Sequence, residues 1–506
     1  MQQWLASRVN LTPRPRPRPN VALAVAMLGH CPGPVRVERL LAMADTLTEM
    51  RQIGLGPVLQ RLANGTASSG EQQLHHLPIP LQSRAEFHDI FPAAGTTDTE
   101  YVSLLAGRRA WLPRAVDDFF ANGGEKLWLV AIPESEGLSG FLPAPNTLLH
   151  EPASLRGVAT VAAIPEVGSL ALPDLERLQV PARLADVPRV RLDNPSPRFL
   201  PCGTVIDDDH RERRNSGEME LSQMPDPAPF NQLLQGILPF LSEHRPDLQI
   251  LLTLPLAYAA ELDTPAPDPA ALQTLRDIRD GDSGHRLRQM QFVFPYLRGA
   301  DYALHSPVGI ISGRQSARAQ QQGPWRSVAG QPLQTDGLPY PAQSVAATVA
   351  LRNDPGIGIL RARQGRVTLD DERLVMPALH PQDYAHSNDL SRFDGFRAAE
   401  IMRLLGYLQR QLRALGEQLL FTVDYRDPRP RLLLERFFRH LQQQGALRGA
   451  TAEEAFHIEE IRSREGQMIY EIRIAPAFPI DQLRLTFSNL NGQWQGRVNP
   501  GGISHG

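Results

Sequence analysis

Two short runs of polar side chains have residue types that could hold a metal ion. Asp207-Asp208-Asp209-His210 presents several hard oxygen ligands, which suit Ca²⁺ or Mg²⁺. The run continues into Arg211-Glu212-Arg213-Arg214, however, and mixed charge of this kind is typical of a solvated loop. His75-His76 supplies two imidazoles without a patterned third ligand, so a surface position is the simpler interpretation. We therefore expect no metal site and no cofactor.

The other candidates for chemistry are an acid–base cluster, a glycine pair and two thiols: His380, Asp383 and His386; Gly356 and Gly358; Cys31 and Cys202. The spacing of the acid–base cluster matches no catalytic motif for which a mechanism would explain the spacing. The glycine pair lacks the third glycine and the βαβ frame of a dinucleotide site. The thiols are expected to be small buried hydrophobes. The sequence therefore predicts a protein that is not an enzyme, with a soluble α/β enzyme of unrecognised site as an alternative.

Bulk composition narrows the class of protein. The 506 residues are 42% apolar and carry a formal net charge of -3, from 52 basic and 55 acidic side chains. This balance gives no general attraction to nucleic acid or to an anionic lipid surface. The apolar run Val21 to Leu28 is too short to span a bilayer. We expect about three domains, each with its own hydrophobic core. We also expect the protein to be made in the cytoplasm, to have no nucleic-acid partner and not to insert into a membrane.

Strand and helix patterns alternate along the chain. Short apolar or alternating runs predict strands at Val21–Leu28, Leu77–Leu81, Lys126–Ile132, Val158–Ile164, Gln249–Leu254, Met468–Ile474 and Leu483–Phe487. Apolar residues at helical spacing or helix end signals predict helices over residues 36–63, 84–90, 112–121, 173–178 (or a loop), 230–244, 397–419 and 431–444. Asp207–Glu220 and Thr264–Gly284 are expected to be surface loops.

This order of elements indicates α/β followed by α+β. We expect a multi-domain chain with mixed sheets and flanking helices, a C-terminal α+β module and extended terminal arms. Local end signals support individual helices. Ser83 with Glu86 forms a capping box. Asn122-Gly123-Gly124 stops the helix before it, because glycine readily adopts the left-handed C-cap conformation.

Three stretches, in order over residues 77–487, resemble the tail sheath proteins of contractile phages and related injection systems. They are Pro80 to Phe87 with Ala115 to Gly124 and the strand after it; Phe294 to Leu297 with Ser306 to Gly313; and Arg403 to Leu408 with Leu433 to Phe438, Gly445 to Gly449, Glu454 to Phe456 and Ile474 to Pro476. The usual N-terminal segment of the family is replaced by the proline–arginine run Thr12 to Pro19. An insertion of roughly forty residues separates the first strand from Pro80.

The resemblance implies a structural subunit that polymerises around an inner tube and contracts to drive it through a target envelope. The implied partners are other sheath subunits in a six-fold helical stack, the inner tube protein, and baseplate and tail-terminator or cap proteins. Such a subunit is assembled in the bacterial cytoplasm as part of a virion tail or a released contractile particle. A cap, terminator or baseplate adaptor of the same machine is the alternative.

The resemblance also divides the chain into five parts. Residues 1–20 would be an N-terminal arm, 21–150 the N-terminal part of the sheath core, 151–345 a middle α/β domain, 346–487 a tube-facing domain, and 488–506 a C-terminal arm. Arms of this family join neighbouring copies by adding strands to their sheets.

Two candidate sites follow from this division. The inter-subunit arm would use Leu483, Leu485, Phe487, Leu490 and Trp494, although a closing hairpin is also compatible with the sequence. The tube-facing helix would present Arg431, Arg436 and Arg439 to acidic groups, although these residues also fit an ordinary solvated helix face. Exposed ion pairs are weak and screened by salt, which suits a contact that must break during contraction.

Overall fold

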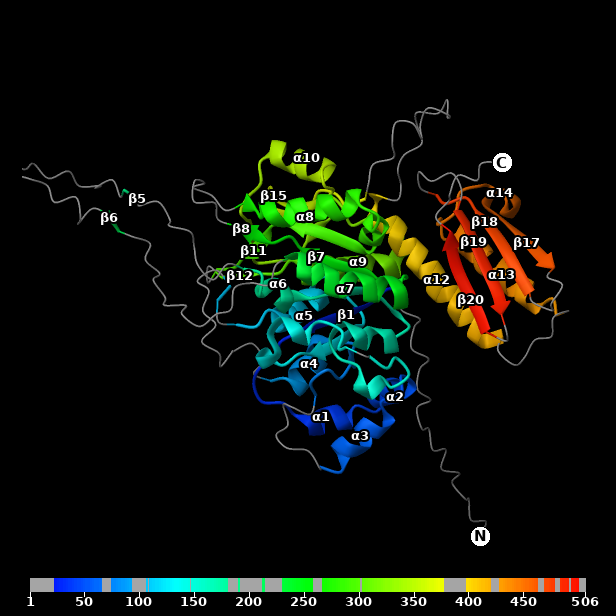
Figure 1. Cartoon of the computed structure of the whole chain (residues 1–506), viewed down its shortest axis with the longest axis horizontal. Coiled ribbons are helices and arrows are strands. Elements are labelled where there is room, and N and C mark those ends of the chain that lie inside the picture. The colour runs from blue at the N-terminus through cyan, green and yellow to red at the C-terminus, as the bar shows by residue number, and fades with distance from the viewer. Residues whose placement is uncertain are drawn as a thin grey trace, which may run out of the picture.

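The computed structural model describes most of the chain. The described residues are 22–65, 74–92, 106–107, 109–145, 147–180, 190–191, 212–213, 230–257, 266–300, 303–376, 397–419, 427–462, 468–477, 483–490 and 493–499. The N-terminal arm, the Asp207–His210 run, Cys202 and the cluster of His380, Asp383 and His386 lie outside them. A sheet-centred body and a smaller C-terminal module stand side by side (Figure 1).

A nine-stranded sheet forms the centre of the body. Its strands, in spatial order, are β13 (Pro332–Leu333), β16 (Arg366–Leu369), β15 (Gly358–Arg363), β10 (Met290–Phe294), β7 (Gln249–Thr253), β4 (Val167–Ala171), β1 (Ala24–Gly29), β3 (Leu127–Ala131) and β2 (Ile79–Leu81). The six strands from β15 to β3 are parallel, and antiparallel strands close both edges. Parallel central strands are buried on both faces, which explains their near-continuous apolar sequences.

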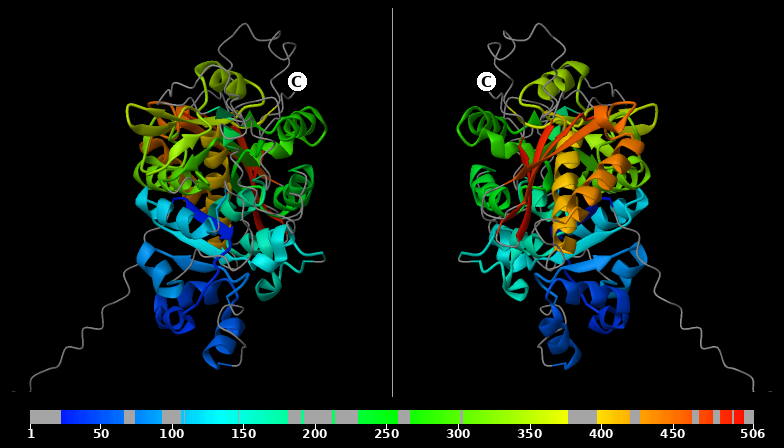
Figure 2. Two further views of the ribbon diagram at one scale, coloured as in Figure 1. Left: turned by 90° about the vertical axis from the view of Figure 1, so that its left-hand side faces the viewer. Right: turned by 90° about the vertical axis from the view of Figure 1, so that its right-hand side faces the viewer.

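Two apolar cores lie on the two faces of this sheet, because successive strand residues point to opposite sides. The helices packed on one face are α1 (Val37–Ala42), α2 (Ala44–Gln52), α3 (Gly56–Ala63), α4 (Arg84–Ile90), α5 (Leu112–Ala121) and α9 (Val308–Gln322). The helices on the other face are α6 (Pro173–Arg177), α7 (Phe230–His244), α8 (Pro269–Asp280) and the 3-10 helices η3 (Gly157–Ala163) and η5 (Gly284–Gln289). Figure 2 shows helices on both sides of the body.

Smaller elements complete the body. Further helices are η1 (Glu134–Gly140), η2 (Pro152–Ser154) and α10 (Val345–Asn353). A three-stranded sheet has the order β12 (Leu304–His305), β11 (Tyr296–Arg298), β14 (Leu338–Tyr340). Two short pairs join β5 (Val190–Arg191) to β6 (Glu212–Arg213) and β8 (Leu256–Ala257) to β9 (Ala266–Pro267).

Glycines of the sequence motifs bring α5 and α9 into close contact. A Cβ on Gly309 would lie 2.5 Å from the carbonyl oxygen of Ala115, and one on Gly313 would lie 2.3 Å from that of Phe119. The two glycines are four residues apart and so share one face of α9. Gly123, just after α5, has φ 85° and ends the helix as the sequence predicted.

In the residues that the structure describes, the C-terminal module combines three helices with a four-stranded antiparallel sheet. The helices are α12 (Ala399–Leu419), α13 (Arg429–Gln443) and α14 (Ala452–Ala455). The strands, in spatial order, are β17 (Phe456–Arg462), β18 (Met468–Ile474), β19 (Leu483–Leu490) and β20 (Gln493–Asn499). Their apolar side chains form a third core, which also takes in Trp325 from the body.

The predicted elements are confirmed at most positions, and two predictions are wrong. Val158–Ile164 is not a strand but belongs to η3, and the neighbouring strand is β4. A short apolar run does not distinguish a buried strand from a buried helical turn. Thr264–Gly284 is not a loop, since it contains α8. Asp268 caps that helix by accepting from the Ala270 amide at 3.0 Å.

The large sheet crosses the expected limits at residues 150 and 345. It contains β1 to β4 as well as β7, β10, β15 and β16, so residues from 24 to 369 share one sheet. The insertion between the first strand and Pro80 contains α1 to α3, which lie together at one end of the molecule (Figures 1 and 2).

Candidate interaction site in the C-terminal module

The residues proposed for the C-terminal arm lie in two strands of the module. Leu485 and Phe487 are fully buried in the third core, where β19 pairs with β18. Leu483 and Leu490 also belong to β19, and Trp494 belongs to β20. β20 pairs with β19, so within a single chain the segment folds as a hairpin. The assignment of these residues to an inter-subunit arm stays a prediction.

The arginines proposed to face a tube lie on the outer side of α13. Leu434, Phe438 and Leu441 are buried on its inner side, whereas Arg431, Arg436 and Arg439 are exposed. The Nε of Arg431 lies 3.1 Å from Oε1 of Glu435, one turn away. An exposed pair at this spacing stabilises a helix by only about 0.3–0.5 kcal/mol, so it leaves the basic groups available for another surface.

A shallow cavity of about 190 Å³ adjoins this basic face. Its wall combines Arg431, Glu435 and Arg439 of α13 with Glu453 and His457 from α14 and β17. The helix face is therefore of mixed charge where it meets the sheet, and basic where Arg436 lies.

Helix α12 is joined to the body by a buried two-point ion pair. Nη1 of Arg403 lies 2.9 Å from Oε1 of Glu372, and Nη2 lies 2.9 Å from Oε2. Gln315 and the Val328 amide donate further hydrogen bonds to the same carboxylate. Burial alone would raise the pKa of Glu372, but Arg403 and these donors hold it below its ordinary value.

A second buried cluster lies about two turns further along α12. The carboxylate of Asp247 accepts from Nε and Nη2 of Arg245, both at 3.0 Å, and its backbone oxygen accepts from Nη1 of Arg410 at 2.9 Å. Burial would raise the pKa of Asp247, but the three surrounding guanidinium groups, of Arg245, Arg410 and Arg413, lower it. Burial lowers the pKa of Arg410 to about 10, although Asp247 opposes this effect.

The place where α/β enzymes commonly bind ligands is filled by protein. β1 lies between β3 and β4, so successive connections leave it in opposite directions, and ligands usually bind beyond the carboxyl ends of such strands. Here the buried carboxylate of Asp174 occupies that position. It accepts from the amides of His30, Trp111 and Leu112 at 2.8, 2.7 and 2.9 Å. This carboxylate therefore connects β1 to the start of α5.

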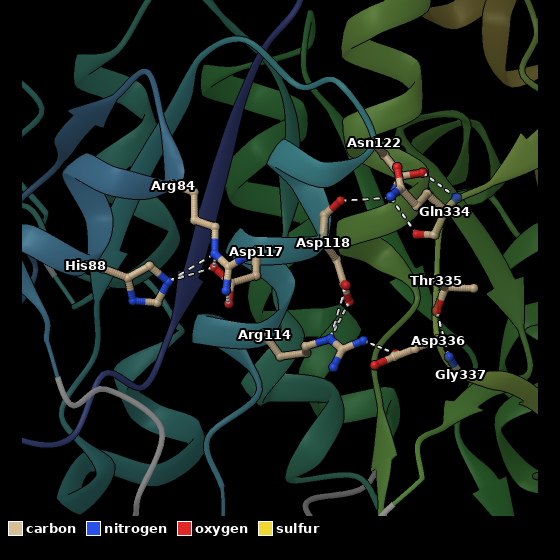
Figure 3. Close-up of polar contacts among 10 residues, drawn as sticks. All are labelled: Arg84, His88, Arg114, Asp117, Asp118, Asn122, Gln334, Thr335, Asp336 and Gly337. Carbon is tan, nitrogen blue, oxygen red and sulfur yellow. Dashed lines mark hydrogen bonds and ion pairs between the residues drawn. The ribbon is translucent and has the colours of Figure 1, made fainter.

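A polar network around α5 also connects segments of the body (Figure 3). Asp117 accepts from Arg84 at 2.8 Å and pairs with His88 at 2.9 Å, which links α4 to α5. Arg114 bridges Asp118, at 3.0 Å, to Asp336 in the segment before β14. Burial raises the pKa of Asp118 to about 6, although Arg114 opposes this effect.

Asn122, the first residue after α5, binds the same distant segment. Its Nδ2 donates to the carbonyl of Gln334 at 2.9 Å, and its Oδ1 accepts from the Gln334 amide at 2.8 Å. The asparagine of the sequence motif therefore joins the end of α5 to residues more than two hundred positions later. These contacts indicate a structural role for the network.

His76 and Cys31 are among the other sequence candidates that lie in the described residues. His76 is buried rather than on the surface, which corrects the prediction: its Nε2 lies 2.9 Å from Oε2 of Glu136, and its Nδ1 accepts from the Gly157 amide. These partners satisfy both ring nitrogens, so the ring can be buried. Cys31 is buried, as expected.

No group of three or more potential metal ligands occurs among the residues that the structure describes. None of the described helices is both long and apolar enough to cross a membrane.

The sequence analysis missed the two buried ion clusters. Arg403 and Arg410 are seven residues apart, within a helix whose other regularly spaced positions are apolar. Seven residues are close to two turns, so both arginines share one face. A cation on such an apolar face predicts a buried ion pair. Its partners, Glu372 and Asp247, lie in other elements, so the sequence alone did not identify them.

Comparison with known proteins identifies the fold. No family model and no curated protein matches the sequence. The chain is similar to a chain in the contracted-state baseplate of the anti-feeding prophage (AFP), with a TM-score of 0.52, 16% identity and 94% of each chain covered. It also aligns with the contracted AFP helical sheath (TM-score 0.49, 13% identity, 94% and 98% covered) and with the sheath tail protein of Desulfitobacterium hafniense (TM-score 0.45, 10% identity, 94% and 98% covered).

The similarity to the AFP baseplate chain extends over nearly the whole length of both proteins, and the two share a fold. The mixed α/β fold class expected from the sequence is thereby confirmed. The match also supports the resemblance noted from the sequence motifs.

Proposed function

We propose that this chain is a structural subunit of a contractile injection machine, which assembles with further copies into a sheath-type ring around an inner tube. The observation that carries the proposal is the shared fold with a chain of the contracted AFP baseplate over 94% of both chains. The sequence motifs support it independently, because their glycines and Asn122 form the α5–α9 contact and its connection to the 334–337 segment.

The C-terminal module provides the surfaces that such an assembly needs. β17 and β20 are the terminal strands of its described four-stranded sheet, and a strand at a sheet edge can pair with a strand from another chain. The exposed arginines of α13 provide a basic helix face for an acidic tube. Contraction would be a rigid-body change between two packings of these subunits. In this role the chain supplies shape and contacts, and no catalysis.

A ring at the baseplate is a second candidate for the position of this subunit. It is favoured by the AFP match, which is to a baseplate chain. The partners would then include baseplate components as well as the tube and other sheath subunits. In either position the product would be a virion tail or an extracellular particle assembled in the bacterial cytoplasm.

Electron microscopy of the protein, expressed with the neighbouring tail genes, tests both positions. A main sheath subunit would give six-fold cylinders that repeat along the tail, whereas a baseplate subunit would appear as one ring at one end. The protein expressed alone is the control for spontaneous assembly. A chain that remains monomeric under all conditions and is absent from purified particles would contradict the proposal.

A further inference from the structure

A cavity of about 450 Å³ lies between the end of α9, the middle of α12 and the C-terminal half of α13. Three aromatic residues line it, Trp325, Tyr407 and Phe437, together with amide side chains that include Gln411 and Gln444. Trp325 is buried, and its indole N–H has no partner among the described residues. Tyr407 meets the Trp325 ring edge-on at 6.1 Å between centroids. The cavity therefore combines flat apolar rings with uncharged hydrogen-bonding groups.

The N-terminal segment of the chain arrives at the rim of this cavity. Ala22, the first residue that the structure describes, is part of the lining, and its amide lies 3.4 Å from Oε1 of Gln320 at the end of α9. The sequence immediately before it, residues 12–20, reads TPRPRPRPN. The chain therefore enters the described structure at the cavity, directly after a proline repeat.

The chemistry of the repeat fits the chemistry of the cavity. Alternating prolines favour the polyproline II conformation, which leaves its carbonyls without internal hydrogen bonds. Aromatic grooves bind such segments because the segment loses little entropy and its rings pack on flat side chains. The glutamine amides can donate to the free carbonyls.

The arginines of the repeat fit the cavity without ion pairs. None of the described residues that line it carries a carboxylate. Guanidinium groups can instead stack on Tyr407 and Phe437, which are only partly buried, an arrangement that Arg favours. Polyproline II has three residues per turn. Each edge of the repeat therefore presents proline and arginine in alternation.

We propose that residues 13–20 bind in this cavity of the same chain as a polyproline II segment. The connection is short enough, because at about 3.1 Å per residue Pro19 lies within about 10 Å of Ala22. This docking does not depend on the proposed function, since it concerns a single chain. It would fix the N-terminal segment against the joint between the body and the C-terminal module.

Competition by a labelled peptide tests the proposal. The probe is a fluorescent peptide of residues 11–21, added to the full-length protein and to the full-length variant Pro13→Ala, Pro15→Ala, Pro17→Ala and Pro19→Ala. The variant should bind one peptide per chain. The unaltered chain should bind it at least about tenfold more weakly, because its tethered segment competes at a high effective concentration. Peptide binding to neither chain, or equal binding to both, would overturn the proposal.

Substitutions in the cavity of the proline variant locate the binding site. Phe437→Ala should weaken peptide binding by about tenfold or more, whereas Leu432→Ala, on the exposed side of the same helix, should leave it unchanged. A peptide with its prolines replaced by alanine should not bind, and one with its arginines replaced by glutamine should retain part of the affinity. Equal losses for both helix variants would contradict the site. Dimers of the unaltered chain that require the prolines would show docking on a second copy and would also overturn the proposal.

Discussion

Arg403 of α12 and Glu372, which follows β16, form a bidentate ion pair in which both side chains are essentially inaccessible to solvent. The pair joins the C-terminal module to the body, and the buried carboxylate has Gln315 and Val328 as further donors. The pair matters for stability because removing one partner leaves the other as an uncompensated buried charge.

Arg403→Met should therefore lower the free energy of unfolding by about 3–5 kcal/mol. The double variant Arg403→Met with Glu372→Met should recover part of this loss, because no unpaired charge is then buried. Urea unfolding followed by circular dichroism measures both. Equal stability of the single variant and the original protein would show that the pair contributes nothing to the joint.

The α5–α9 contact predicts a steric effect at Gly313. A methyl group there would lie 2.3 Å from the backbone oxygen of Phe119, which has to move. Gly313→Ala should cost about 1–3 kcal/mol of stability. Gly56→Ala in the first turn of α3 is the matched control, since no atom lies within 4 Å of its added Cβ, and it should be neutral or slightly stabilising. Thermal unfolding of the two variants would refute the contact if both behaved alike.

Glu176 predicts a pH dependence of stability. Burial raises its pKa to about 8, although the Thr253 amide donates to its Oε1 at 2.7 Å. The folded state therefore binds a proton that the unfolded state releases near pH 4.5, and the stabilisation present at low pH is lost as pH rises through 8. This group should contribute a fall of about 4 kcal/mol between pH 5 and pH 9.

Glu176→Gln should remove that part of the slope, since a neutral amide has no proton to lose. The exposed Glu125→Gln provides a control for the loss of one charge. Urea titrations at several pH values from 5 to 9 make the comparison. A Glu176→Gln profile that keeps the original slope would exclude Glu176 as its source.

The basic face of α13 predicts an effect on assembly without an effect on folding. Arg436→Glu with Arg439→Glu should reduce co-assembly with the tube by about tenfold or more at low salt, while thermal stability changes little. Arg363→Glu with Arg366→Glu, an equal charge change on the exposed β15–β16 hairpin, is the control. Sedimentation of particles measures the yield. Equal losses for both pairs would assign the effect to net charge and not to α13.

The sequence predicts the elements whose signals are local. Helix α4 begins directly after its capping residue Ser83, and helix α5 ends directly before Asn-Gly-Gly, as their end signals predict. The error at η3 has a physical cause, because a five- to seven-residue apolar run has no length signal to separate strand from helix. At α8 the cap Asp268 and the following proline were readable, but the high polarity of the segment favoured a loop.

The candidate site depends on contacts that no local pattern contains. The exposed positions of Arg431, Arg436 and Arg439 follow from the apolar spacing of α13, so their helix was predictable. The pairing of Arg403 with Glu372 requires two elements to meet in space. The cavity around Trp325 likewise requires α9, α12 and α13 to converge, which only the assembled fold provides.

Helix α12 has a mechanical consequence because it belongs to two structures at once. Its first half is joined to the body by guanidinium–carboxylate contacts, and its apolar side chains belong to the core of the C-terminal module. A pull along the axis of α12 would therefore act on a helix of 21 residues whose backbone hydrogen bonds run along that axis. Torque applied at one end turns the other with it, so the two parts would move as one lever.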